Sequence, residues 1–209
     1  MSYIENIFIC LAAPLLLAIL CLRRDSRRPL IFLLAGMTVC LLSSYVSTFA
    51  AVMSGLDRTA ASYELAPVVE EGMKFLPILF YLLIFEPERK NALSGTLLVA
   101  VGFATFENVC FLTSYGTSDL LRLLIRGFGT GAMHVVCGMV VAIGLFLLWD
   151  QAKLQIVGVF ALLCFVIRFH AIFNILVSQE GFVFWLGSAI PLVVVLVYLI
   201  FFRKKIKVT

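Results

Sequence analysis

Long apolar runs constrain this chain more than any other feature of its 209 residues. A run of about 20 apolar residues can cross the hydrocarbon core of a bilayer as one helix. Lipid offers backbone groups no hydrogen-bond partners, so a spanning chain forms helices or a closed barrel. These runs are nearly continuous rather than alternating, which favours helices. Seven spans are predicted, over residues 5–22, 30–53, 64–85, 92–114, 127–149, 155–178 and 182–202.

Composition also favours an all-α, polytopic membrane bundle and excludes a water-soluble globule. The chain is 63% hydrophobic and only 13% charged, whereas a soluble domain carries about 25% charged residues. The six cysteines fall in apolar runs without CxxC spacing, a pattern typical of buried thiols rather than disulfides. We therefore expect one integral-membrane domain over residues 1–209, surrounded by the lipid bilayer and without a nucleic-acid partner.

The distribution of basic residues predicts the orientation of the bundle, because cytoplasmic loops are rich in lysine and arginine. One side of the predicted bundle carries 11 of the 16 basic residues, chiefly at 23–28 and 203–207, and the other side carries three. This bias predicts an N-terminus outside and a cytoplasmic C-terminus. Charges alternate with Leu and Ile in segment 119–127, which is either a short interfacial helix or the beginning of the fifth span.

Ionisable side chains inside the predicted spans point most directly to function. A charge at mid-membrane costs a few kcal/mol, so such residues are functional candidates. With about 1.5 Å of rise per residue, those on spans three to six share a depth of roughly 10 Å below the outer surface. Four separate helices thus place polar groups at one level. The candidates are Glu70, Glu71, Lys74, Glu107, His134, Arg168 and His170, accompanied by Asn108 and Asn174.

Helical spacing and residue type suggest what this set can do. Glu70 and Glu71 precede Lys74 by four and three residues, so either carboxylate can pair with the ammonium. His170 and Asn174 are also four apart and can face one point. A carboxylate with an imidazole suits general-base activation of water, and His and Asn donors suit an oxyanion hole. Alternatively, two histidines with one or two glutamates suit Zn²⁺, although no HExxH is present.

Other interpretations use the same residues. A proton- or ion-coupled transporter needs ionisable groups across the full membrane, but the inner half of spans three to six is almost free of them. A non-catalytic membrane partner protein would keep the scaffold alone. Single residues also have structural explanations, such as interhelical hydrogen bonds or, for Arg126, an interfacial anchor. The one-sided cluster favours an enzyme active site.

Four short motifs make the chain resemble the PrsW family, within a superfamily of CAAX-protease-like and bacteriocin-processing-like membrane proteases. EExxK matches residues 70–74, FxxxEN matches 103–108, a lone histidine matches His134, and HxxxN matches 170–174. The motifs occur in family order on successive spans, and the resemblance covers about residues 66–178. It implies an intramembrane endopeptidase of the bacterial cell (inner) membrane. The implied substrate is a membrane-anchored anti-sigma factor, which receives its first, extracytoplasmic (site-1) cut in stress signalling.

The resemblance also implies roles for individual residues. Water activation falls to Glu70 and Glu71, and Glu107 and His134 complete a water- or metal-binding set. Related prenyl-protein proteases carry histidine where this chain has Glu107, so hydrolysis is either glutamate-type or metal-dependent. The implied oxyanion stabilisers are His170 and Asn174; the supporting residues are Lys74, Asn108 and Arg126; and the zinc ligands, if a metal is used, are Glu71, Glu107, His134 and His170.

Overall fold

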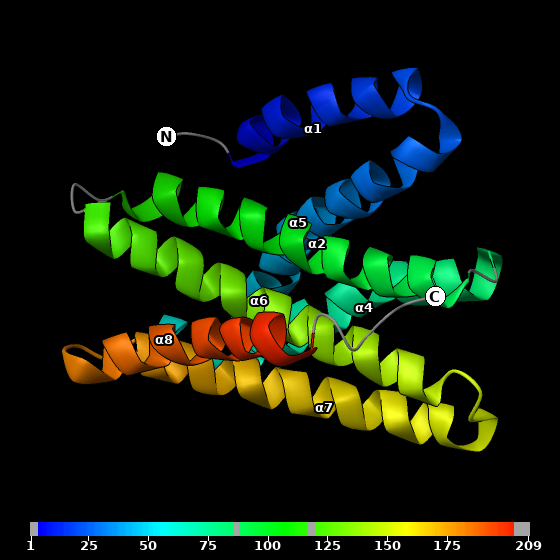
Figure 1. Ribbon diagram of the computed structural model, residues 1–209. Coiled ribbons are helices and arrows are strands. Elements are labelled where there is room, and N and C mark those ends of the chain that lie inside the picture. The colour runs from blue at the N-terminus through cyan, green and yellow to red at the C-terminus, as the bar shows by residue number, and fades with distance from the viewer. Residues whose placement is uncertain (1–3, 86–87, 117–119, 203–209) are drawn as a thin grey trace.

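The computed structural model describes residues 4–85, 88–116 and 120–202, and the regular structure in these residues is entirely helical (Figure 1). The predicted all-α bundle is confirmed. Helices α5, α6, α7 and α8 run side by side, whereas α2 crosses α5 obliquely and α1 diverges from the bundle at one end (Figure 1). The elements are α1 (Ile4–Cys21), α2 (Arg24–Ser54), α3 (Arg58–Ala60), the π-helix η1 (Ala61–Leu65), α4 (Ala66–Phe85), α5 (Arg89–Tyr115), α6 (Leu120–Leu148), α7 (Ala152–Val177), α8 (Phe182–Val197) and the π-helix η2 (Tyr198–Phe202).

Six helices within the described residues are long and apolar enough to cross a membrane, and they match six of the predicted spans. The remaining predicted span, 64–85, coincides with α4. This helix is 20 residues long, but Glu70, Glu71 and Lys74 interrupt its apolar sequence. The chain is thus a multi-pass membrane protein, and α4 carries three of the ionisable candidate residues.

Two predicted boundaries were wrong. The charged segment 23–28 is mostly helix rather than loop, because α2 begins at Arg24 and arginine is a good helix former. The separate interfacial helix near 119–127 does not exist as such: from Leu120 onward these residues are the first turns of α6, which continues unbroken to Leu148. The other expectation for this segment, the beginning of the fifth span, therefore holds. Residue 119 and the basic tail at 203–207 lie outside the described residues.

The core lies where α5 packs between α2 and α6, the two most extensive helix contacts in the described bundle. Glycines allow α2 and α5 to approach closely. A Cβ added to Gly36 would lie 2.1 Å from the Val99 carbonyl oxygen, and one added to Gly102 would lie 2.1 Å from the Leu33 carbonyl oxygen. Small residues at helix contacts are what membrane bundles use in place of a hydrophobic driving force. This close contact holds α5, which carries Glu107, against the bundle.

We expect Gly102→Ala to destabilise the protein by about 1–3 kcal/mol, because the added methyl group forces two backbones apart. Unfolding of the purified protein in detergent would measure the change. Gly131→Ala is the matched control, since an added Cβ at Gly131 meets no atom within 4 Å. Equal stability of the two variants would contradict the close-packing role of Gly102.

Candidate active site

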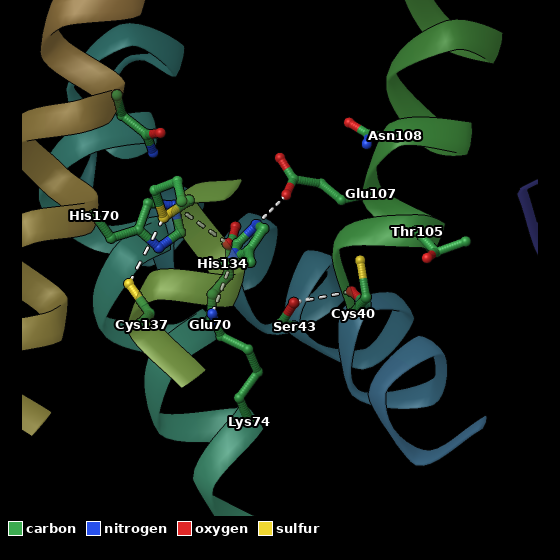
Figure 2. A network of polar contacts seen from close by, with 12 residues as sticks. Cys40, Ser43, Glu70, Lys74, Thr105, Glu107, Asn108, His134, Cys137 and His170 are labelled. Carbon is green, nitrogen blue, oxygen red and sulfur yellow. Dashed lines mark hydrogen bonds and ion pairs between the residues drawn. The ribbon is translucent and has the colours of Figure 1, made fainter. Parts of the chain in front are cut away.

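The ionisable residues of four helices meet in one network inside the bundle. Glu70, Glu71 and Lys74 come from α4, Glu107 from α5, His134 from α6 and His170 from α7. Direct contacts link these side chains across the bundle, as expected from the common depth predicted for them. Figure 2 shows Glu107, His134, His170 and Lys74 pointing toward one shared region. Arg168, by contrast, is exposed on α7 and lies outside this network.

His170 stands between the two adjacent glutamates of α4. Its Nδ1 lies 2.7 Å from Glu71 Oε1, and its Nε2 lies 3.7 Å from Glu70 Oε2. The ring and the Glu71 carboxylate are both buried. A carboxylate that accepts a hydrogen bond from Nδ1–H orients the ring and leaves the lone pair of Nε2 available. Glu71 therefore positions His170, and the free ring nitrogen faces Glu70.

Lys74 joins the two histidine-containing halves of the network. Its ammonium donates to Glu71 Oε1 at 2.6 Å and lies 2.9 Å from Nδ1 of His134. The same ammonium sits 4.9 Å from the centre of the Phe103 ring, which is fully buried. The charge of Lys74 is therefore compensated by one carboxylate and one aromatic face. Sequence reasoning expected the ion pair on α4 but missed the contact from Lys74 to α6.

Glu107 connects His134 to the N-terminal part of α6. One of its oxygens contacts His134 Nε2, and the other accepts from Arg126 Nη2 at 3.1 Å. The Arg126 guanidinium also lies 4.6 Å from the centre of the Phe111 ring. An ammonium donating to Nδ1 of His134 places the ring proton on Nε2, so that Nε2 donates to Glu107. Arg126 is therefore paired with Glu107 inside the bundle, and its supporting role stays a prediction.

The two asparagines of the motifs bind backbone carbonyls of neighbouring segments. Asn108 Nδ2 donates to the Gly127 carbonyl at 3.2 Å and so ties α5 to α6. Asn174 Nδ2 donates to the Ser62 carbonyl at 2.8 Å and so ties α7 to η1. π-helical turns such as η1 are frequent at functional sites, and this one leads directly into α4. The predicted oxyanion role of Asn174 stays a prediction.

Buried polar atoms without partners gather around this network. Within the described residues, four of the five such side-chain atoms belong to the site or to the adjoining face of α6. Thr130 is one of them: it lies between Arg126 and His134 at four-residue intervals and is 1% exposed. Unpartnered buried groups cost about 1–3 kcal/mol each, so they call for a functional explanation. The four atoms are Glu70 Oε2, Asn108 Oδ1, Arg126 Nη1 and Thr130 Oγ1.

Three residues of the site are arranged so that they can hold a metal ion. Glu70, His134 and His170 each offer a ligand atom, and these atoms lie within 4.8 Å of one another. Zinc binds such ligands at about 2.0–2.2 Å, so small inward movements suffice. The unpartnered Glu70 Oε2 and the available Nε2 of His170 fit this use. Both ring nitrogens of His134 already have partners, so one must release Lys74 or Glu107 before it can bind a metal ion. The ligand set predicted from the sequence also included Glu71 and Glu107, which are not in this group: Glu71 contacts Lys74 and His170, and Glu107 contacts His134 and Arg126. That larger set stays a prediction.

We expect Lys74→Met to destabilise the protein by about 3–5 kcal/mol, because it leaves the buried Glu71 carboxylate without its ammonium. The double variant Glu71→Gln/Lys74→Met removes both charges and is expected to recover most of that stability. Denaturant unfolding of the four proteins of this double-mutant cycle gives the coupling energy. Simple additivity of the two single changes would show that the pair is not energetically coupled.

Carboxylates and imidazoles that contact one another inside an apolar helical bundle form a candidate membrane-embedded hydrolase site. The model of one protein family, described as PrsW family intramembrane metalloprotease, matches residues 27–202. The chain therefore belongs to the PrsW family of intramembrane metalloproteases, and it is a membrane protease. No curated protein and no solved structure matches the chain.

Proposed function

We propose that this protein is an endopeptidase that cuts a membrane-anchored protein within the outer half of the bilayer. The contact network of three glutamates and two histidines, with unpartnered polar atoms beside it, is the observation that carries this proposal. Hydrolysis of a peptide bond needs an activated water and donors for the developing oxyanion. The cluster offers carboxylates that can activate a water and hydrogen-bond donors that can stabilise an oxyanion, at one level of the bundle.

The side chains divide into reacting and positioning groups. Glu70 has a buried carboxylate oxygen without a hydrogen-bond partner, so in the glutamate-type alternative it is assigned to the water that attacks the scissile carbonyl. The Glu107–His134 pair can hold and transfer a proton, since the two side chains are in contact. Glu71 and Lys74 act indirectly, by orienting His170 and His134.

The donor chemistry favours the metal-dependent alternative over the glutamate-type one. We assign the ligands to Glu70, His134 and His170, whose donor atoms already lie close together. A carboxylate with two imidazoles is a set that zinc enzymes use. When bound there, zinc supplies Lewis acidity, which polarises the scissile carbonyl and makes water a good nucleophile near neutral pH. Release of Glu107 by His134 would then free a carboxylate to accept a proton.

The side of the membrane on which the site lies bears on the kind of substrate that it can cut. The excess of basic residues on one side supports an outside N-terminus, which puts the site near the extracytoplasmic face. Such a site suits the first cut, at site 1, of an anti-sigma factor with one membrane span. The bacterial cell membrane is the location that goes with that role.

Reconstitution with a single-span substrate tests this function. The purified protein and a substrate with tags on both ends are placed in vesicles, and mass spectrometry maps the cut. We expect cleavage in the half of the substrate span nearest its extracytoplasmic end. Cleavage near the cytoplasmic end would overturn the assigned side, and ion flux without any cleavage would favour the transporter.

A labelling experiment checks the orientation independently. Single cysteines at positions 5 and 207, in a background without native cysteines, are exposed to a membrane-impermeant thiol reagent in intact cells. Labelling at 5 and protection at 207 are expected. The reverse pattern would place the ionisable cluster near the cytoplasmic face and would exclude an extracytoplasmic cut.

A further inference from the structure

A large apolar cavity lies between α1, α2 and α4, away from the active site. Its volume is about 1170 Å³, above the range of about 300–1,000 Å³ that is typical of small-molecule pockets. Leu16 of α1, Ile31 and Phe32 of α2, and Leu76 and Phe80 of α4 form much of its wall. The cavity therefore has the size and lining that a long hydrocarbon chain requires.

A second, polar cavity adjoins the first at the basic end of the bundle. It has a volume of about 500 Å³ and includes Lys90, Ser94 and Gly95 of α5 in its wall. The two cavities have wall residues in common, among them Arg28 and Glu88. Together they form one space with a charged end and an apolar end, which is the shape of a lipid with its headgroup.

The charges at the polar end have no charge partner among the described residues. In the described part of the chain, the side chains of Arg28, Glu88 and Lys90 make no hydrogen bond or ion pair. Their neighbours differ: Arg27 donates to the Leu20 and Leu22 carbonyls at the end of α1, and Arg89 pairs with Asp150. Arg27 also lines the apolar cavity, but the end of α1 satisfies it, whereas Arg28, Glu88 and Lys90 line the cavities without a charge partner among the described residues.

Helix electrostatics makes an anion especially favourable at this place. Arg28 lies in the second turn of α2 and Lys90 in the first turn of α5, close to the positive ends of both helix dipoles. Neither helix has a side-chain hydrogen bond at its N-cap. Cations at such ends are unfavourable unless a negative group compensates them. A phosphate between the two side chains would supply that compensation.

We propose that the joined cavities bind one molecule of phosphatidylethanolamine. Its phosphate contacts Arg28 and Lys90, and its ammonium contacts Glu88, so that all three unpaired charges are matched. One acyl chain fills the apolar cavity between α1 and α4. A purely anionic headgroup would leave Glu88 without a partner beside a phosphate, which is the reason for choosing a zwitterionic lipid.

Such a lipid would hold α1 in place. Ala12 is the one buried residue described in α1, and the helix diverges from the rest of the bundle toward the turn at Arg23 (Figure 1). Its N-terminal half has protein partners, since Phe8 packs edge-on against Phe106 and Glu5 accepts from Tyr45. The C-terminal half faces the cavity through Leu16 and Ile19. The lipid therefore takes the place of missing side-chain contacts there.

Native mass spectrometry of the delipidated full chain, titrated with defined lipids, tests the headgroup assignment. We expect one phosphatidylethanolamine per chain, with weaker binding of phosphatidylcholine and phosphatidylglycerol of the same acyl length. Arg28→Gln and Glu88→Gln should each weaken phosphatidylethanolamine binding about tenfold, because each removes a charge-assisted contact. Arg23→Gln is the charge-matched control: Arg23 is exposed in the same turn but lines neither cavity.

The acyl-chain assignment has its own pair of variants. Ala35→Phe fills the apolar cavity from α2 and should lower lipid binding about tenfold, whereas Ala50→Phe, on the same helix outside the cavity, should not. Equal binding by the wild type, Arg28→Gln and Ala35→Phe would overturn the proposal. Phosphatidylglycerol binding that is tighter and insensitive to Glu88→Gln would overturn the headgroup, and a lipid-free dimer would identify a second copy as the occupant.

Discussion

His170→Ala is expected to lower the rate of substrate cleavage by about 10³-fold or more. The ring lies between Glu70 and Glu71, and one of its nitrogens is held by Glu71 while the other faces Glu70. Its loss removes a metal ligand or proton carrier and also leaves the buried Glu71 with one partner fewer. General acid–base groups contribute about 10²–10⁴-fold, and loss of a metal ligand adds to this effect. Initial rates in vesicles with a single-span substrate measure the change.

Matched variants separate loss of chemistry from loss of structure. Ile172→Ala lies on the same helix but faces outward, with 54% of the residue exposed, so its activity should remain at the wild-type level. Thermal unfolding in detergent shows whether His170→Ala is still folded. Glu71→Gln and His134→Ala should give comparable losses of activity. Wild-type rates in all three site variants would end the assignment of a protease site to this cluster.

The helices and the shared depth of the site were predictable from simple physical rules. Long apolar runs have no stable alternative to helices in lipid, so the spans followed from their lengths. Positions 70, 107, 134 and 170 fell at one depth because helical rise converts residue number directly into height. The resemblance to the PrsW family rested on the same positions, and the family match over residues 27–202 confirms it.

Contacts between helices were less predictable, because they depend on helix rotation and side-chain rotamers. The contact of Lys74 with His134 required α4 and α6 to face each other, and spacing along one helix says nothing of this. Arg126 was predicted as a supporting residue or an interfacial anchor, but its pairing with Glu107 across α5 and α6 could not be predicted from the distance between the two in the sequence. Phe103, the phenylalanine of FxxxEN, contacts both Lys74 and His134. These contacts could not be predicted, because one phenylalanine among many apolar residues of a span looks like an ordinary core residue.

Metal removal is expected to abolish cleavage, and Zn²⁺ is expected to restore it. Glu70, His134 and His170 bring three ligand atoms together, and the free oxygen of Glu70 has no hydrogen-bond partner within the described residues. Three protein ligands leave a fourth position open for chemistry. The purified protein should therefore contain about one zinc per chain by elemental mass spectrometry. Glu70→Gln should lower this content, because an amide is a poorer zinc ligand than a carboxylate.

Asn91→Asp serves as a control, since Asn91 lies at the opposite end of the bundle and should leave the zinc content unchanged. Metal content is measured separately from activity, so a variant that loses catalysis alone is distinguished from one that loses the ion. Full cleavage by a metal-free protein would exclude the metal-dependent scheme and favour glutamate-type hydrolysis. In that case Glu70 would activate water directly, and the loss in Glu70→Gln would be independent of added Zn²⁺ because no ion would connect this carboxylate to the histidines.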